Sequence, residues 1–94
     1  MDKKTEDFYQ RLKQELTDST LWPAEYLFKF IVPSDQQKIV QIENSFDQMG
    51  AVIDTTQSKT GKYTSVSINV RMASAQSVID KYIELSTIEG IISL

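Results

Sequence analysis

The most regular pattern in the chain is an alternation of apolar and polar residues over positions 63–72. From position 66 onward every second position is apolar, and these positions are Val66, Ile68, Val70 and Met72. The polar positions between them are Ser65, Ser67, Asn69 and Arg71. A period of two predicts a strand of an antiparallel sheet that is buried on one face and solvated on the other.

A second strand is predicted over residues 25–32, EYLFKFIV, because aromatic and β-branched residues dominate it. One face carries Tyr26, Phe28, Phe30 and Val32. The other face carries Leu27, Lys29 and Ile31, which is more apolar than a purely solvated face should be. We therefore expect this second face either to contact a partner or to be covered by the N-terminal residues.

Helices are predicted where the apolar spacing changes to three and four. Residues 5–18 form an amphipathic helix, with Phe8, Leu12 and Leu16 on one face. A second helix follows Ser34, which with Gln37 has the spacing of a capping box, and it ends at Gly50. Its apolar positions are Ile39, Ile42, Phe46 and Met49. A third helix runs from Ala73 and Ser74 to about Leu85, with Val78, Tyr82 and Leu85 on its apolar face.

Two shorter strands complete the predicted fold, over residues 51–58 and 91–94. After the first helix the order is β-α-β-β-α-β. This order predicts an α+β fold of the ferredoxin-like class, in which a four-stranded antiparallel sheet carries two helices on one face. With 94 residues the chain is long enough for one domain. We divide it into an N-terminal helical extension, residues 1–20, and the ferredoxin-like domain, residues 21–94.

The segment SKTGK at 58–62 invites comparison with a phosphate-binding loop. A Walker A motif requires a glycine where Thr56 stands and Ser or Thr where Tyr63 stands. It also leads from a strand to a helix, whereas this segment joins two strands. The segment therefore predicts a hairpin turn in which Gly61 supplies a positive φ. Lys59 and Lys62 keep the turn soluble and are also available to an anionic partner.

The composition narrows the possible functions. The chain has neither cysteine nor histidine, and so lacks the commonest nucleophiles, general bases and metal ligands. We therefore expect no enzymatic activity and no metal or other cofactor. The net charge of −3 disfavours nucleic acid as a partner, because such binders usually carry excess Lys and Arg. No apolar run is long enough to span a membrane and the N-terminus has no signal-peptide pattern, so a cytoplasmic location is expected.

The candidate binding surface combines the open sheet face with the hairpin. Its residues are Lys29, Lys59, Lys62, Tyr63, Ser65, Ser67, Asn69 and Arg71. Arg71 would contact an anionic group. The alternative is an ordinary solvated face. Trp22 and Pro23, just before the first strand, are read either as a partner anchor or as a packing cluster at the edge of the core.

Three segments of the chain, WPAEYLFKFIV, SKTGKYTSVSINV and IEGIISL, resemble the YbeD-like family of small bacterial proteins. The resemblance covers roughly residues 21–94, and its most specific part is the hairpin from Ser58 to Ile68. It implies a fold similar to ACT-type regulatory domains, which bind small effectors such as amino acids, often between paired domains. The glycine that such domains often carry after the first strand is replaced here by Pro33 and Ser34.

These observations favour a non-enzymatic regulatory or protein-interaction domain with an unidentified protein partner. The alternative is an ACT-like sensor of an amino acid or metabolite that acts in trans, with a homodimer as its expected form.

Overall fold

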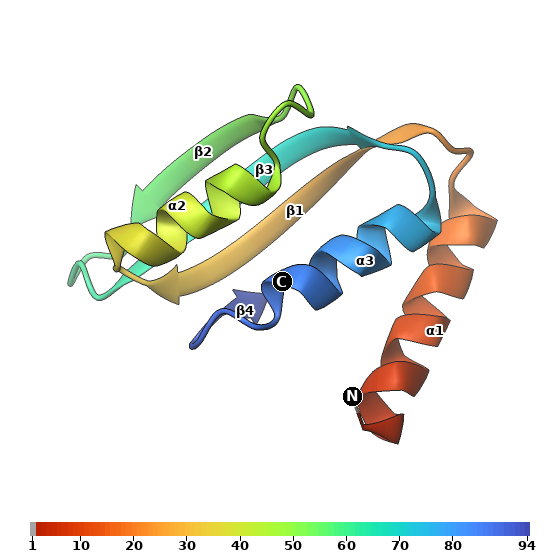
Figure 1. The fold of residues 1–94 in the computed structure, drawn as a ribbon, viewed down its shortest axis with the longest axis horizontal. Helices are drawn as coiled ribbons and strands as arrows, with labels where there is room; N and C mark the ends of the chain where they lie inside the picture. The colour runs from red at the N-terminus through yellow and green to blue at the C-terminus, as the bar shows by residue number, and fades with distance from the viewer. Residues whose placement is uncertain (1) are drawn as a thin grey trace.

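The computed structural model describes residues 2–94, with three helices and four strands (Figure 1). The helices are α1 (Lys3–Ser19), α2 (Gln36–Ser45) and α3 (Ala75–Leu85). The strands are β1 (Ala24–Pro33), β2 (Val52–Gln57), β3 (Tyr63–Met72) and β4 (Ile92–Ser93). The element order is the one predicted from the apolar pattern.

The four strands form one antiparallel sheet in the order β2-β3-β1-β4. The central pair β1 and β3 is in register over ten residues, from Ala24 opposite Met72 to Pro33 opposite Tyr63. Both α2 and α3 lie on one face of this sheet (Figure 1). The predicted ferredoxin-like fold with an additional N-terminal helix is therefore confirmed.

The core lies between the sheet and α2 and α3. Its sheet side is made of the alternating residues predicted to point inward, and Phe28, Phe30, Val66 and Ile68 are all fully buried. An aromatic cluster forms its centre, in which the Phe28 ring contacts Phe30, Phe46 and Tyr82 at centroid distances of 5.1–6.0 Å. Ring contacts of this kind add about 0.5–1.5 kcal/mol each to the area they bury.

Helix α1 packs beside α3 and leaves the open sheet face uncovered (Figure 1). Its Leu12 and Leu16 lie against the edge of the core, and no residue of the helix is fully buried. The indole Nε1 of Trp22 donates a hydrogen bond to the Leu16 carbonyl over 3.1 Å, which fixes the last turn. Trp22 is thus a packing residue, and the interpretation in which α1 covers the open sheet face is wrong.

Two predicted details of α2 are also wrong. The N-cap is Asp35, whose carboxylate accepts the Gln37 N–H over 2.9 Å, while the Ser34 hydroxyl bonds to Thr64 instead. Ser34 is thus held by the neighbouring strand end and cannot cap. The helix ends at Ser45, well before Gly50, and the turn that follows has positive φ at both Gln48 and Gly50. A capping box is present at α3 instead, between Ser74 and Ser77.

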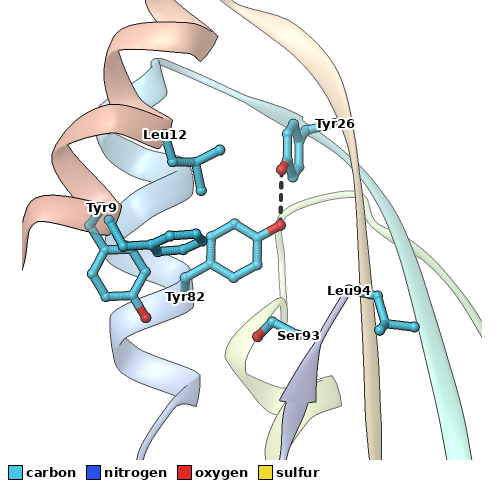
Figure 2. A pocket seen from close by; sticks show the side chains of 7 residues that line it. Tyr9, Leu12, Tyr26, Tyr82, Ser93 and Leu94 are labelled. Carbon is cyan, nitrogen blue, oxygen red and sulfur yellow. Dashed lines mark hydrogen bonds between the residues drawn. The ribbon is translucent and has the colours of Figure 1, made fainter. Parts of the chain in front are cut away.

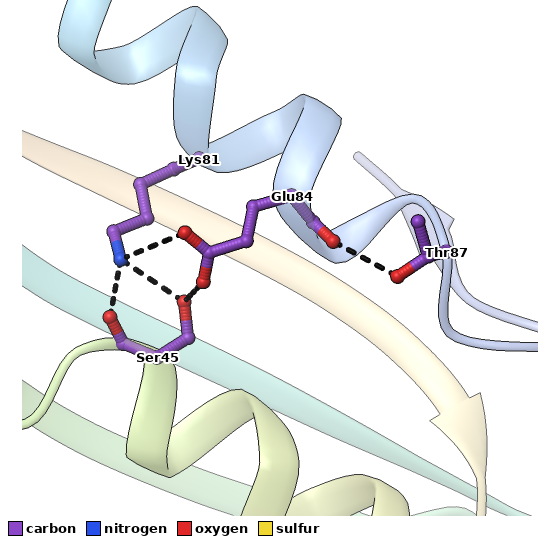
Figure 3. Close-up of polar contacts among 4 residues, drawn as sticks. All are labelled: Ser45, Lys81, Glu84 and Thr87. Carbon is purple, nitrogen blue, oxygen red and sulfur yellow. Dashed lines mark hydrogen bonds and ion pairs between the residues drawn. The ribbon is translucent and has the colours of Figure 1, made fainter.

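A polar cluster joins the C-terminal end of α2 to α3 (Figure 3). The Lys81 ammonium donates to the carbonyl and to the hydroxyl of Ser45, and it lies 5.0 Å from the centre of the Phe46 ring. Glu84 accepts from the Ser45 hydroxyl and pairs with Lys81 at 3.5 Å. A cation at the end of a helix satisfies free carbonyls and favours the helix dipole. The cluster therefore fastens the two helices together.

Candidate functional site

The open sheet face is a four-stranded surface whose residues are defined by the strand register. Directly paired residues share a face, so Lys29 lies beside Ser67, and Ser67 beside Asp54. Every predicted face residue is there: Lys29, Ser65, Ser67, Asn69 and Arg71. Tyr63 begins β3 on the same face and is 49% exposed. No hydrogen bond or ion pair joins these side chains to one another among residues 2–94.

The hairpin between β2 and β3 adds the two predicted lysines at one end of this face. The Ser58 N–H donates to the Tyr63 carbonyl over 2.8 Å, and the Gly61 N–H to the Ser58 carbonyl over 2.9 Å. Gly61 has φ +74°, as the turn requires. Lys59 and Lys62 are both exposed. The turn joins two strands, so a phosphate loop is excluded and the hairpin prediction is confirmed.

Apolar side chains are distributed over the same face. Leu27 is 55%, Val52 63% and Ile92 51% exposed, and each comes from a different strand. Beside the hairpin, between β1, β2 and β3, the surface has a shallow hollow with a volume of about 250 Å³. The residues around this hairpin hollow are Ile31, Thr56, Gln57, Ser58, Tyr63 and Ser65. Half-exposed apolar residues on the same face as a hollow are typical of a contact surface.

A second hollow, of about 240 Å³, lies between α1, α3 and the sheet (Figure 2). Its lining residues are Phe8, Tyr9, Leu12, Tyr26, Tyr82, Ser93 and Leu94. None of these described residues has a charged side chain. We call it the tyrosine hollow, because the hydroxyls of Tyr26 and Tyr82 meet over 2.9 Å at its wall.

The hydroxyls of Tyr26 and Tyr82 already form a hydrogen bond with each other. Burial, followed by the hydrogen bond with Tyr26, raises the pKa of the Tyr82 hydroxyl above its ordinary value. The Tyr82 phenol is therefore neutral at physiological pH, and the hollow is apolar, with the hydrogen-bonded hydroxyl pair as a polar point on its wall.

Sequence reasoning missed both hollows and one strand of the open face. Val52, Asp54 and Thr56 of β2 lie on that face, and the predicted surface included none of them. The hairpin register would have placed these residues on the open face. Ser58 pairs with Tyr63 at the turn, so Gln57 lies opposite Thr64 and Thr56 opposite Ser65, and the pairing continues in this way along both strands. The tyrosine hollow had no such signal, because α1 and β4 are brought together only by the fold.

The geometry defines a small α+β domain of the ferredoxin-like class, with one sheet face uncovered. Residues 18–94 match the model of a family described as Protein of unknown function (DUF493), and the chain belongs to this family. The match confirms the YbeD-like resemblance. No curated protein and no solved structure matches the chain. Over residues 2–94, no helix is both long and apolar enough to cross a membrane.

Proposed function

We propose that this protein is a non-enzymatic interaction domain, and that the open sheet face with its hairpin binds another protein. One observation carries the proposal: α2 and α3 cover one face of the sheet, α1 packs beside α3, and the other face keeps Leu27, Val52 and Tyr63 about half exposed or more. If only one face of the sheet were meant to be buried, the other face would be expected to carry polar residues.

The charges of this surface indicate the chemistry of the partner. Lys29, Lys59, Lys62 and Arg71 contribute four positive charges, against the carboxylates of Glu25 and Asp54, while the whole chain carries −3. An acidic protein surface with a protruding apolar side chain complements this arrangement. The apolar side chain would enter the hairpin hollow beside Tyr63, and Lys59 and Lys62 would contact the acidic groups around it.

Neighbouring threonines of β2 provide a matched test. Thr56 lies on the open face and Thr55 on the opposite one, since their partners on β3 are Ser65 and Val66. Both threonines are exposed. A photo-crosslinking amino acid is placed at either position in the cells that produce the protein. We expect one adduct of defined mass, identified by mass spectrometry, from position 56 and none from position 55.

The partner identified in this way is then purified for affinity measurements. Tyr63→Ala should weaken binding at least tenfold, as for a central contact, while Gln76→Ala on α3 should leave it unchanged. Equal adducts at both positions would refute the proposed surface. An adduct of twice the chain mass would show that the face joins two copies instead.

An effector sensor ranks second. The tyrosine hollow offers an amino acid no charged side chain for its ammonium or carboxylate group. A sensor should gain thermal stability with one metabolite, in proportion to the logarithm of ligand concentration over its dissociation constant. The Thr56 adduct should then be absent.

A further inference from the structure

Strand β1 is paired along only part of its outer edge. On one side β3 accompanies all ten residues. On the other side β4 pairs only with Phe30 and Ile31, and the Leu94 N–H donates to the Lys29 carbonyl over 2.9 Å. Before Lys29, no strand among the described residues lies beside this edge of β1.

The hydrogen bonds on either side show which backbone groups are left free. The Ser34 N–H donates to the Lys62 carbonyl, so the backbone N–H and C=O groups of even-numbered residues in β1 point toward β3. The hydrogen bond from the Leu94 N–H to the Lys29 carbonyl shows that the backbone groups of odd-numbered residues point toward β4. Because the direction alternates along a strand, the N–H and C=O groups of Glu25 and Leu27 point outward. Among the described residues, no backbone hydrogen bond is made to these outward groups.

The tyrosine hollow opens next to these free groups. Strand β4 runs toward it, and Ser93 and Leu94 stand at its margin (Figure 2). A strand laid along β1 in the direction of β4 would turn alternate side chains toward the helices. The side chain opposite Tyr26 would enter the hollow, since Tyr26 is part of its wall. An apolar cavity of about 150 Å³ already holds a benzene molecule, so 240 Å³ accommodates one aromatic or branched side chain.

Helix α1 supplies the wall that makes this place a pocket. Phe8, Tyr9 and Leu12 line the hollow, and they lie outside the matched family region, which begins at residue 18. Phe8 remains 55% exposed although it borders the hollow. The helix thus adds an incompletely buried apolar wall beside an unpaired sheet edge.

We propose that the outer edge of β1 at Glu25 and Leu27 binds an extended peptide segment of a partner protein, antiparallel to β1, with one large apolar side chain in the tyrosine hollow. The free N–H and C=O groups match the backbone of an extended segment, and a hollow without charged side chains matches an apolar side chain. Opposite Glu25, a basic residue of the peptide is favoured on the open face. This site goes beyond the proposed function, because it uses another edge of the sheet and other residues.

The probe is a phage-displayed library of random twelve-residue peptides, selected on the full chain. We expect the selected peptides to share a large apolar residue followed directly by Lys or Arg, within an alternating apolar pattern. Affinities of the synthesised peptides are then compared for Leu27→Pro and Leu27→Ala. Proline removes the outward N–H without touching the bonds to β3, whereas alanine removes the side chain only. We expect at least tenfold weaker binding for Leu27→Pro and less than threefold for Leu27→Ala.

Hydrogen exchange tests the same site without a variant that could misfold. In the free chain, the amides of Glu25 and Leu27 should exchange fast and the amide of Phe28 slowly. Saturating peptide should slow exchange at Leu27 at least tenfold. The proposal is overturned if no peptide is selected, if peptides bind without slowing Leu27, or if Leu27→Pro binds like Leu27→Ala. Tyr63→Ala should leave peptide affinity unchanged, so the proposal for this edge and the proposal for the open face are tested independently.

Discussion

Gly90, just before β4, lies so close to the Pro33 ring at the end of β1 that there is no room for a methyl group between them. Gly90 precedes β4 with φ +82°, and a Cβ atom there would lie 2.9 Å from Cγ and 3.0 Å from Cδ of Pro33. The Pro33 ring is rigid and ends β1, so it cannot turn aside as a flexible side chain would. Gly90→Ala therefore combines a left-handed backbone conformation with a steric clash.

Glycines elsewhere in the chain separate these two costs. Gly50 and Gly61 have φ +70° and +74°, and a Cβ at either would meet nothing within 4 Å. Alanine at Gly61 should cost only the conformational part, about 1 kcal/mol. Overpacking adds about 1–3 kcal/mol, so Gly90→Ala should lower the free energy of unfolding by about 2–4 kcal/mol. For a domain of this size, each kcal/mol shifts Tm by about 4–8 °C.

Urea denaturation followed by circular dichroism measures the difference. Pro33→Ala removes both clashing atoms, so in the Gly90→Ala background it should recover about 1 kcal/mol or more in a double-mutant cycle. If Gly90→Ala and Gly61→Ala agree within about 0.5 kcal/mol, the contact with Pro33 has no energetic weight and the reasoning fails.

Three further predictions concern hydrogen bonds and charges. Because burial and Tyr26 raise the pKa of Tyr82 in the folded state, the unfolded state loses its proton first, so stability is fully present below about pH 10 and declines above it. In Tyr82→Phe the fall in the urea midpoint between pH 9 and pH 11 should be smaller; an unchanged fall would contradict this assignment. Asp35→Ala and Ser74→Ala should each cost about 1 kcal/mol in urea denaturation, as N-cap losses, and values near zero would show that these caps do not stabilise their helices. Lys81→Met should cost about 1–2 kcal/mol by thermal denaturation, whereas Lys13→Met, on α1, should stay within about 0.5 kcal/mol; equal effects would exclude the helix-fastening role.

The strand residues of the predicted candidate surface share one face of the sheet, as the alternation along β3 predicted. Ser65, Ser67, Asn69 and Arg71 alternate with buried residues, so their common face followed from the period of two alone. Lys29 joined them because β1 carries the same alternation. What the surface binds stays a prediction, since a solvated face and a contact face share this pattern.

Local hydrogen bonding was the weaker part of the prediction. Ser34 fits the capping-box spacing, yet its hydroxyl bonds to Thr64, thirty residues away, and Asp35 caps the helix. The apolar run to Met49 suggested a long α2, but the chain leaves the helix after Ser45, and Phe46 and Met49 reach the core from a turn. Periodicity shows which residues are buried and cannot show the backbone path that buries them.

The sequence by itself determined the elements, their order and the two faces of the sheet, because apolar periodicity and turn residues act over a few neighbouring positions. Only the tertiary structure decided where α1 lies and what it encloses. Phe8, Leu12 and Leu16 could have covered the open face as well as α3, since both offer apolar surface. The tyrosine hollow depends on that choice, which is made by packing between segments far apart in the chain, while the free edge of β1 follows from the short pairing with β4.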